Sequence, residues 1–224
     1  MTRDFSSQDQ SWQEFIEGEI YTDAEAPWRD DPAFVLLRQF SGLREGVGGR
    51  IAPALTQAIG LVRAVAGVDL ARLVQAKRPS LGLCLGFGMN LLELYDLLTV
   101  FELDQIHAYE WIGEHVVEAA QALQSLRDKD PLLSTRLRLH HGTMCDLRAI
   151  ADSSICIIYV ANVFNAEIPM SPETFTGALQ EMMRVLGPGG VLISRGSTGV
   201  LEGKLKRYGR LLLEIPLVSV FQKG

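Results

Sequence analysis

Residues 81–90, LGLCLGFGMN, decide the fold of this 224-residue chain. The run at 81–85 predicts a buried strand, and the helix-like segment at 91–98 follows it. Between them, Gly86 and Gly88 predict a tight turn, because glycine adopts the backbone angles that such a turn requires. A ligand can approach the backbone closely at these glycines, where the helix N-terminus offers unpaired N–H groups. The stretch therefore predicts a strand–turn–helix unit that binds a nucleotide-like ligand.

Short apolar runs alternate with helical segments along the chain after residue 80. Strands are predicted at 106–110, 136–140, 155–160 and 191–194, and helices at 112–126 and 172–186. This alternation is typical of a parallel sheet with helices on both faces. Runs 211–215 and 217–221 have no helix between them, which predicts an antiparallel pair. We therefore expect an α/β three-layer sandwich, with a mostly parallel seven-stranded sheet that ends in an antiparallel strand.

The first part of the chain has a different pattern. Apolar residues recur with helical spacing at Trp12, Phe15, Ile16 and Ile20, and again over 51–66. We therefore divide the chain into a helical N-terminal cap or lid, residues 1–79, and a core, residues 80–224, within one domain. The cap is expected to cover the carboxyl ends of the strands.

Composition excludes several classes of protein. The net charge is −6, and residues 1–31 hold nine acids against two arginines, so the charge balance disfavours a nucleic-acid partner. No apolar run reaches about 18 residues, so we expect no membrane span. The N-terminus has no signal-peptide pattern, and the cysteines lie in or beside apolar segments without ligand spacing. We expect a cytoplasmic protein with a small-molecule substrate, and the sequence leaves a homodimer open.

Two residues at the end of the second predicted strand fit a bound nucleoside. Glu110 closes this strand, and a carboxylate there can accept hydrogen bonds from both ribose hydroxyls. Trp111 follows and can cover an adenine ring, or pack in the core instead. Because ligands bind at the carboxyl ends of parallel strands, 141–147 and 159–165 belong to the same edge.

The order of these pieces resembles the class I S-adenosylmethionine (SAM)-dependent methyltransferases, over about residues 80–224. The segment 182–194, a helix followed by Gly-Pro-Gly-Gly and a strand, is the most specific local match. The resemblance implies that Gly86 and Gly88 approach the amino-acid portion of SAM and that Glu110 binds its ribose. It also implies adenine contacts after the third strand, and places 159–162 near the sulfonium and the methyl acceptor.

The chain departs from the family pattern at several positions. Cys84 stands where the family usually has an acid, Asn90 replaces its third glycine, and Thr143 replaces its adenine-binding acid. Cys84 cannot replace a carboxylate that orders the amino-acid portion. The resemblance implies a cofactor site formed by Cys84, Gly86, Phe87, Gly88, Asn90, Glu110, Trp111, Thr143, Met144 and Val160. Tyr21, Tyr159, Asn162 and Phe164 are the candidate residues for the acceptor.

We therefore expect a SAM-dependent methyltransferase that acts on a small molecule by in-line transfer and releases S-adenosylhomocysteine. Alternatives are another group transfer that uses SAM, or a non-catalytic SAM- or nucleotide-binding module. A dinucleotide dehydrogenase fits less well, because Leu91 occupies the sixth fingerprint position. The sequence identifies no catalytic base, although His140 or His141 can face the site. We expect no metal, and His141 with Asp146 is the minor alternative.

Overall fold

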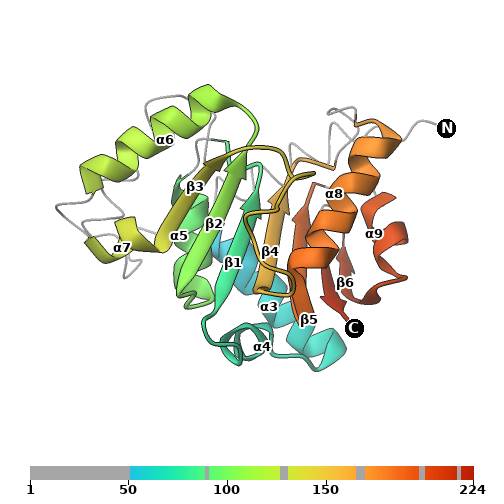
Figure 1. The fold of residues 1–224 in the computed structure, drawn as a ribbon. Coiled ribbons are helices and arrows are strands. Elements are labelled where there is room, and N and C mark those ends of the chain that lie inside the picture. The colour runs from blue at the N-terminus through green and yellow to red at the C-terminus, as the bar shows by residue number, and fades with distance from the viewer. Residues whose placement is uncertain (1–50, 89–90, 127–130, 165–169, 197–199, 216–217) are drawn as a thin grey trace, which may run out of the picture.

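The computed structural model describes residues 51–88, 91–126, 131–164, 170–196, 200–215 and 218–224, which are coloured in Figure 1. Seven strands form one sheet: β1 (Leu81–Leu85), β2 (Gln105–Glu110), β3 (Leu137–His141), β4 (Ile155–Ala161), β5 (Leu186–Arg195), β6 (Gly209–Ile215) and β7 (Val218–Lys223). The described helices are α3 (Ala52–Ala66), α4 (Leu70–Gln75), α5 (Leu91–Val100), α6 (Gly113–Leu126), α7 (Pro131–Arg136), α8 (Pro172–Val185) and α9 (Val200–Leu205).

The sheet has the order β3-β2-β1-β4-β5-β7-β6. Strands β1 to β5 pair in parallel, and β7 pairs antiparallel with both β5 and β6. The direction of winding reverses between β1 and β4, which are neighbours in space but far apart in sequence (Figure 1). Loops diverge at such a point, so it is where an open α/β sheet binds ligands.

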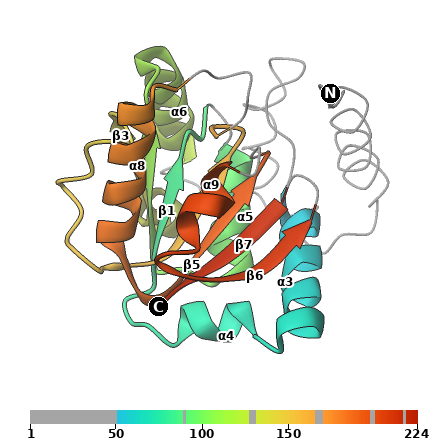
Figure 2. The same cartoon turned by 90° about the vertical axis from the view of Figure 1, so that its right-hand side faces the viewer.

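Helices cover both faces of the sheet (Figure 2). On one face, α3, α5 and α6 pack against a core that includes Phe87, Leu94 and Ile106. On the other face, α8 and α9 pack against a second core that includes Leu83, Ile158 and Leu192. Strands β1, β4 and β5 supply side chains to both cores, which explains why their central residues are apolar on both faces rather than alternating. The expected three-layer sandwich and mostly parallel seven-stranded sheet are confirmed.

The helix boundaries follow from residues at the ends. The Ser171 hydroxyl accepts a hydrogen bond from the Thr174 N–H, and Pro172 occupies the first position of α8, where its missing N–H is harmless. Helix α3 ends at Gly67, which has φ 66° and donates its N–H to the Arg63 carbonyl. These local signals explain why both helices could be predicted from the sequence.

Residues 142–154 connect β3 to β4 without a helix. Leu147 and Ile150 are buried in the second core. The guanidinium of Arg184 in α8 donates hydrogen bonds to the carbonyls of both residues, at 2.9 and 3.0 Å. Arg184 also pairs with Glu181 at 2.8 Å. One side chain therefore satisfies backbone carbonyls that a helix would otherwise satisfy internally.

Several predicted boundaries change in the structure. The short helices α7 and α9 were not predicted, and β5 begins at Leu186, so it includes the Gly-Pro-Gly-Gly segment. Residues 1–50 of the expected cap lie outside the described residues. Within 51–79, α3 packs against α5 and β6. None of the described helices is both long enough and apolar enough to span a membrane.

Candidate functional site

The glycine turn after β1 has the backbone geometry that the sequence predicts. Gly86 and Gly88 have φ angles of 73° and 58°, a region that L side chains rarely adopt. The Gly86 N–H donates to the Tyr109 carbonyl at 2.8 Å, which ties the turn to the end of β2. Among the residues that the structure describes, no atom lies within 4 Å of a Cβ placed on Gly88. Phe87 is buried in the first core, so only its backbone is available to a cofactor.

Glu110 connects the two neighbouring strand ends. Its carboxylate accepts hydrogen bonds from the backbone N–H of Gly88 at 2.8 Å and of Ile112 at 2.9 Å. His115 Nδ1 lies 3.9 Å from Oε1. The Glu110 side chain is buried at the end of β2. Each carboxylate oxygen accepts more than one hydrogen bond, so Glu110 can hold the glycine turn and still accept ribose hydroxyls.

Trp111 is 74% exposed, which excludes packing in the core. Its neighbour Ile112 is also exposed, and the Trp111 carbonyl lies 3.1 Å from His141 Nε2 at the end of β3. A shallow hollow of about 480 Å³ adjoins this pair, lined by Gly113, Glu114, Val116, Val117, Glu118 and His141. An exposed aromatic ring directly after Glu110 is available to stack on a base.

Thr143 and Met144 lie in the turn after β3, next to the end of β2. Thr143 Oγ1 accepts a hydrogen bond from the Cys145 N–H at 3.2 Å, and its carbonyl accepts one from the Asp146 N–H. The hydroxyl hydrogen remains able to donate to an acceptor on a base. Met144 is half-buried against the second core.

The residues at the end of β4 separate into two groups. Tyr159 is buried on the α5 face, whereas Val160 is buried on the α8 face. Phe164 is also buried and contacts Phe175 edge to face, with ring centroids 5.4 Å apart. Asn162 is exposed, has φ 55°, and donates its N–H to the Arg195 carbonyl at 2.8 Å.

An acidic residue that the sequence analysis did not select lies beside Cys84. Glu93, in the first turn of α5, is buried, and its carboxylate faces Tyr159. Burial, partly offset by the positive charge of Arg195, raises the pKa of Glu93 to about 7. Burial also holds the pKa of Cys84 well above its usual value, and the charges of Glu93 and Glu110 add to the effect. An acid inside the apolar run LLELYDLL is the sequence signal that could have identified Glu93.

Two candidates, Tyr21 and Asn90, lie outside the described residues. Within the described ranges, no group of three His, Cys, Asp or Glu side chains is arranged to hold a metal ion.

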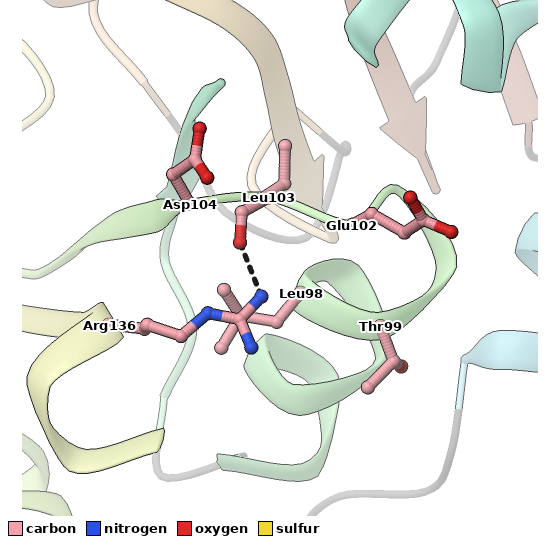
Figure 3. Close-up of a pocket in the computed structure, with 6 residues that line it drawn as sticks. All are labelled: Leu98, Thr99, Glu102, Leu103, Asp104 and Arg136. Carbon is pink, nitrogen blue, oxygen red and sulfur yellow. Dashed lines mark hydrogen bonds between the residues drawn. The ribbon is translucent and has the colours of Figure 1, made fainter. Parts of the chain in front are cut away.

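A second hollow, of about 430 Å³, lies at the opposite edge of the sheet (Figure 3). It is lined by Leu98, Thr99, Glu102, Leu103, Asp104 and Arg136, and Arg136 donates to the Leu103 carbonyl. These residues precede β2 and β3, so the hollow lies away from the glycine turn. It contributes nothing to the candidate cofactor site.

Comparisons with known proteins find a likeness in three-dimensional structure only. No protein-family model matches the sequence, and no curated protein matches it significantly. A methyltransferase from Geobacter sulfurreducens aligns over 93% of this chain and 97% of its own, with 18% identity and a TM-score of 0.55.

Two further solved structures align over a smaller part. A putative sarcosine dimethylglycine methyltransferase from Galdieria sulphuraria matches 59% of this chain, with 21% identity and a TM-score of 0.43. The match spans only 43% of that protein. A geranyl diphosphate C-methyltransferase from Streptomyces coelicolor, solved with S-adenosyl-L-homocysteine, matches 78% of this chain and 52% of its own, at 10% identity and a TM-score of 0.43. The Geobacter protein thus shows that the chain has the fold of a methyltransferase.

Proposed function

We propose that the chain is a SAM-dependent methyltransferase that transfers the methyl group in line to a small-molecule acceptor. The observation that carries the proposal is Glu110, which binds the Gly88 N–H at the point where the sheet reverses its winding. This contact sets a carboxylate beside a glycine turn, and a Cβ on Gly88 would meet no atom of the described residues within 4 Å. A carboxylate in this position suits the hydroxyls of a ribose, and the glycine turn beside it suits a charged group attached to that ribose. The fold shared with the Geobacter methyltransferase supports the same reading.

The residues present fit the parts of this cofactor. In this proposal, Glu110 accepts the ribose hydroxyls, Trp111 covers the adenine, and Thr143 with Met144 borders the adenine. The glycine turn leaves room for the amino-acid portion. The cofactor, when bound, supplies an electrophilic methyl group on a sulfonium. The protein then has to align the acceptor with that methyl group, and alignment by itself can supply much of the rate.

A ligand-binding experiment tests the proposal. SAM, S-adenosylhomocysteine and ATP are each titrated against the protein, and the shift in unfolding temperature is measured. A ligand at about 100 times its Kd should stabilise the folded state by about 2.7 kcal/mol. We expect the two SAM-type ligands to shift the transition and ATP to have no effect. The proposal is wrong if none of the three shifts it at millimolar concentration.

A second measurement separates an enzyme from a binding module. The protein is incubated with SAM labelled in its methyl group and with a small-molecule extract, and labelled products are identified by mass spectrometry. We expect label in a small molecule and release of S-adenosylhomocysteine. Binding without formation of any product would favour the non-catalytic alternative, and a product that carries another part of SAM without the methyl label would favour a different group transfer.

A further inference from the structure

Two histidines form a hydrogen-bonded pair between the edge strand β3 and its neighbour β2. His107 Nδ1 in β2 lies 3.0 Å from His140 Nε2 in β3. The ring centroids are 5.2 Å apart and the ring planes make an angle of 17°, so the two nitrogens lie between the centroids and point at each other. Tyr109 stacks on His140, with centroids 4.5 Å apart. The two imidazoles therefore share an in-line N–H···N hydrogen bond.

The pair keeps this hydrogen bond in only some protonation states. A neutral imidazole has one donor and one acceptor nitrogen, whereas an imidazolium has two donors. One hydrogen between the facing nitrogens is enough when both rings are neutral or when one is charged. When both rings are charged, two N–H groups face each other at 3.0 Å and neither can accept. Protonation of the second ring must therefore break the contact.

The surroundings of the pair also oppose protonation. Burial, the charge of His140 and the charge of Arg138 lower the pKa of His107, and burial with Arg138 lowers the pKa of His140. Tyr109 is uncharged, because burial raises its pKa and the charges of Asp146, in the 142–154 connection, and Glu181, in α8, add to the effect. At neutral pH both histidines are therefore uncharged and the hydrogen bond is present.

The position of β3 depends on β2. Strand β3 lies at the edge of the sheet and pairs with β2 alone among the described strands (Figure 1). Leu137 and Leu139 face the first core, so His140 lies on the opposite face. Just beyond His140 the chain enters the candidate site, where the Gly142 N–H donates to the Glu110 carbonyl at 3.0 Å. Release of His140 would therefore loosen a segment that borders this site.

We propose that His107 and His140 form an acid-sensitive latch, which holds the end of β3 and the turn 141–144 against β2 and opens when both rings are charged. The open form takes up protons that the closed form cannot, so acid shifts the equilibrium toward the open form. Opening therefore begins below the ordinary histidine pKa of 6.5. The latch does not require the proposed function, whereas its effect on a bound cofactor rests on that function.

Amide hydrogen exchange, measured by mass spectrometry on the full chain, tests the latch. The native protein, His140→Gln, Arg138→Gln and Arg63→Gln are compared at about pH 7.5 and about pH 5.5, and rates are converted to protection factors. Glutamine at 140 can still form a hydrogen bond and does not titrate. Arg138→Gln removes an exposed charge that lowers both pKa values. Arg63, exposed in α3 on the other face of the sheet, is the control for loss of a charge.

In the native protein we expect the protection factor of residues 137–144 to fall at least about fivefold on acidification, as expected for the loss of one hydrogen bond. The protection factors of β1 and β4 should change by less than about twofold. His140→Gln should show no fall over 137–144. Arg138→Gln should show the fall at a higher pH, and Arg63→Gln should behave like the native protein.

Nuclear magnetic resonance of the ring protons separates a latch from a merely structural pair. In the native protein His107 and His140 should titrate in two separate steps, because the second proton has to break the contact. In His140→Gln, His107 should titrate at a higher pH, because the charge that lowers its pKa is gone. The proposal is overturned if protection over 137–144 does not fall in acid, if it falls equally in His140→Gln, or if His107 titrates at the same pH in both proteins.

Calorimetric titration with S-adenosylhomocysteine tests the effect on the candidate site. Glu93 titrates in the same range, so the native protein is compared with His140→Gln at both pH values to isolate the histidines. We expect acid to weaken binding at least about fivefold more in the native protein than in the variant. Equal weakening would overturn the link between the latch and the site. If neither protein binds the ligand at about pH 7.5, the proposed function fails, and the exchange and resonance experiments still decide the latch.

Discussion

Replacement of Glu110 by glutamine should destabilise the protein even without ligand. The native carboxylate accepts the Gly88 and Ile112 N–H groups at 2.8 and 2.9 Å from a buried position. A glutamine has one oxygen, so one of these N–H groups would face an amide NH₂, which cannot accept its hydrogen. A hydrogen bond to a charged group contributes about 1.5–3 kcal/mol. We therefore expect the free energy of unfolding to fall by about 1.5–3 kcal/mol.

Urea unfolding of the ligand-free protein, followed by circular dichroism, measures this loss. For a domain of this size each kcal/mol lowers the unfolding temperature by about 2–4 °C, which gives a second estimate by calorimetry. Glu114→Gln is the matched control, because it removes a carboxylate from the first turn of α6 at an exposed position. Its effect should stay below about 1 kcal/mol, the contribution of a charge near a helix N-terminus.

An unfolding free energy for Glu110→Gln within about 0.5 kcal/mol of the native value would refute the reasoning, since surface substitutions already vary by that amount. Glu110 would then not hold the glycine turn. Glu110→Ala extends the test, because it removes both hydrogen bonds and should cost about twice as much. A variant that kept its stability but lost SAM affinity would restrict Glu110 to a role in ligand binding.

Four other changes have defined outcomes. Gly86→Ala should lower the unfolding free energy by about 1–3 kcal/mol and weaken SAM binding, because φ is 73° and the new Cβ would lie 2.7 Å from Val163 Cγ2. Gly203→Ala in α9 is the control, since its new Cβ would meet no atom of the described residues within 4 Å. In the same urea titration this control should be neutral or stabilising. Arg184→Ala should lower the free energy of unfolding by about 2–4 kcal/mol and speed amide hydrogen exchange around Leu147 and Ile150. Arg148→Ala, at an exposed position, should lower it by less than about 1 kcal/mol. Equal losses in the two variants would contradict the role of Arg184. Burial raises the pKa of Glu93 from 4.5 to about 7, so the folded state holds this proton more tightly than the unfolded state and the unfolding free energy should fall as pH rises from about 4.5 to 7. Glu93→Gln should reduce the slope of the unfolding free energy against pH by up to about 1.4 kcal/mol per pH unit. An unchanged slope would argue against a buried, titrating Glu93. Labelling of thiols at about pH 8 should modify half-buried Cys145 first, since burial raises the pKa of Cys84 far above its usual value and that of Cys156 to about 11. Mass spectrometry identifies the labelled residue. Fast modification of Cys84 or Cys156 would contradict this order.

The strand and helix order was predictable because it depends on neighbours in sequence. An apolar run of five residues before two glycines predicts β1 and its turn, and Ser171-Pro172 predicts the start of α8. The position of Glu110 at the end of β2 followed from the same pattern. The exposure of Trp111 did not follow from the sequence, since a tryptophan after a strand can equally pack in the core, and the structure shows that its side chain is 74% exposed.

What required the tertiary structure is the environment of the charged residues. The sequence places Glu93 in an apolar helix, but its burial against Tyr159 depends on β4 lying beside β1. The paired positions of these two strands are 75 residues apart in the chain, as Gly82 with Ile157 shows. The two hydrogen bonds of Glu110 and the contacts of Arg184 with the 142–154 connection likewise join segments that no local pattern relates. Apolar periodicity determines which residues form strands and helices, because it is a property of adjacent residues. Hydrogen bonds and pKa values at the site depend on distances between strand ends, and those distances exist only once the sheet has formed.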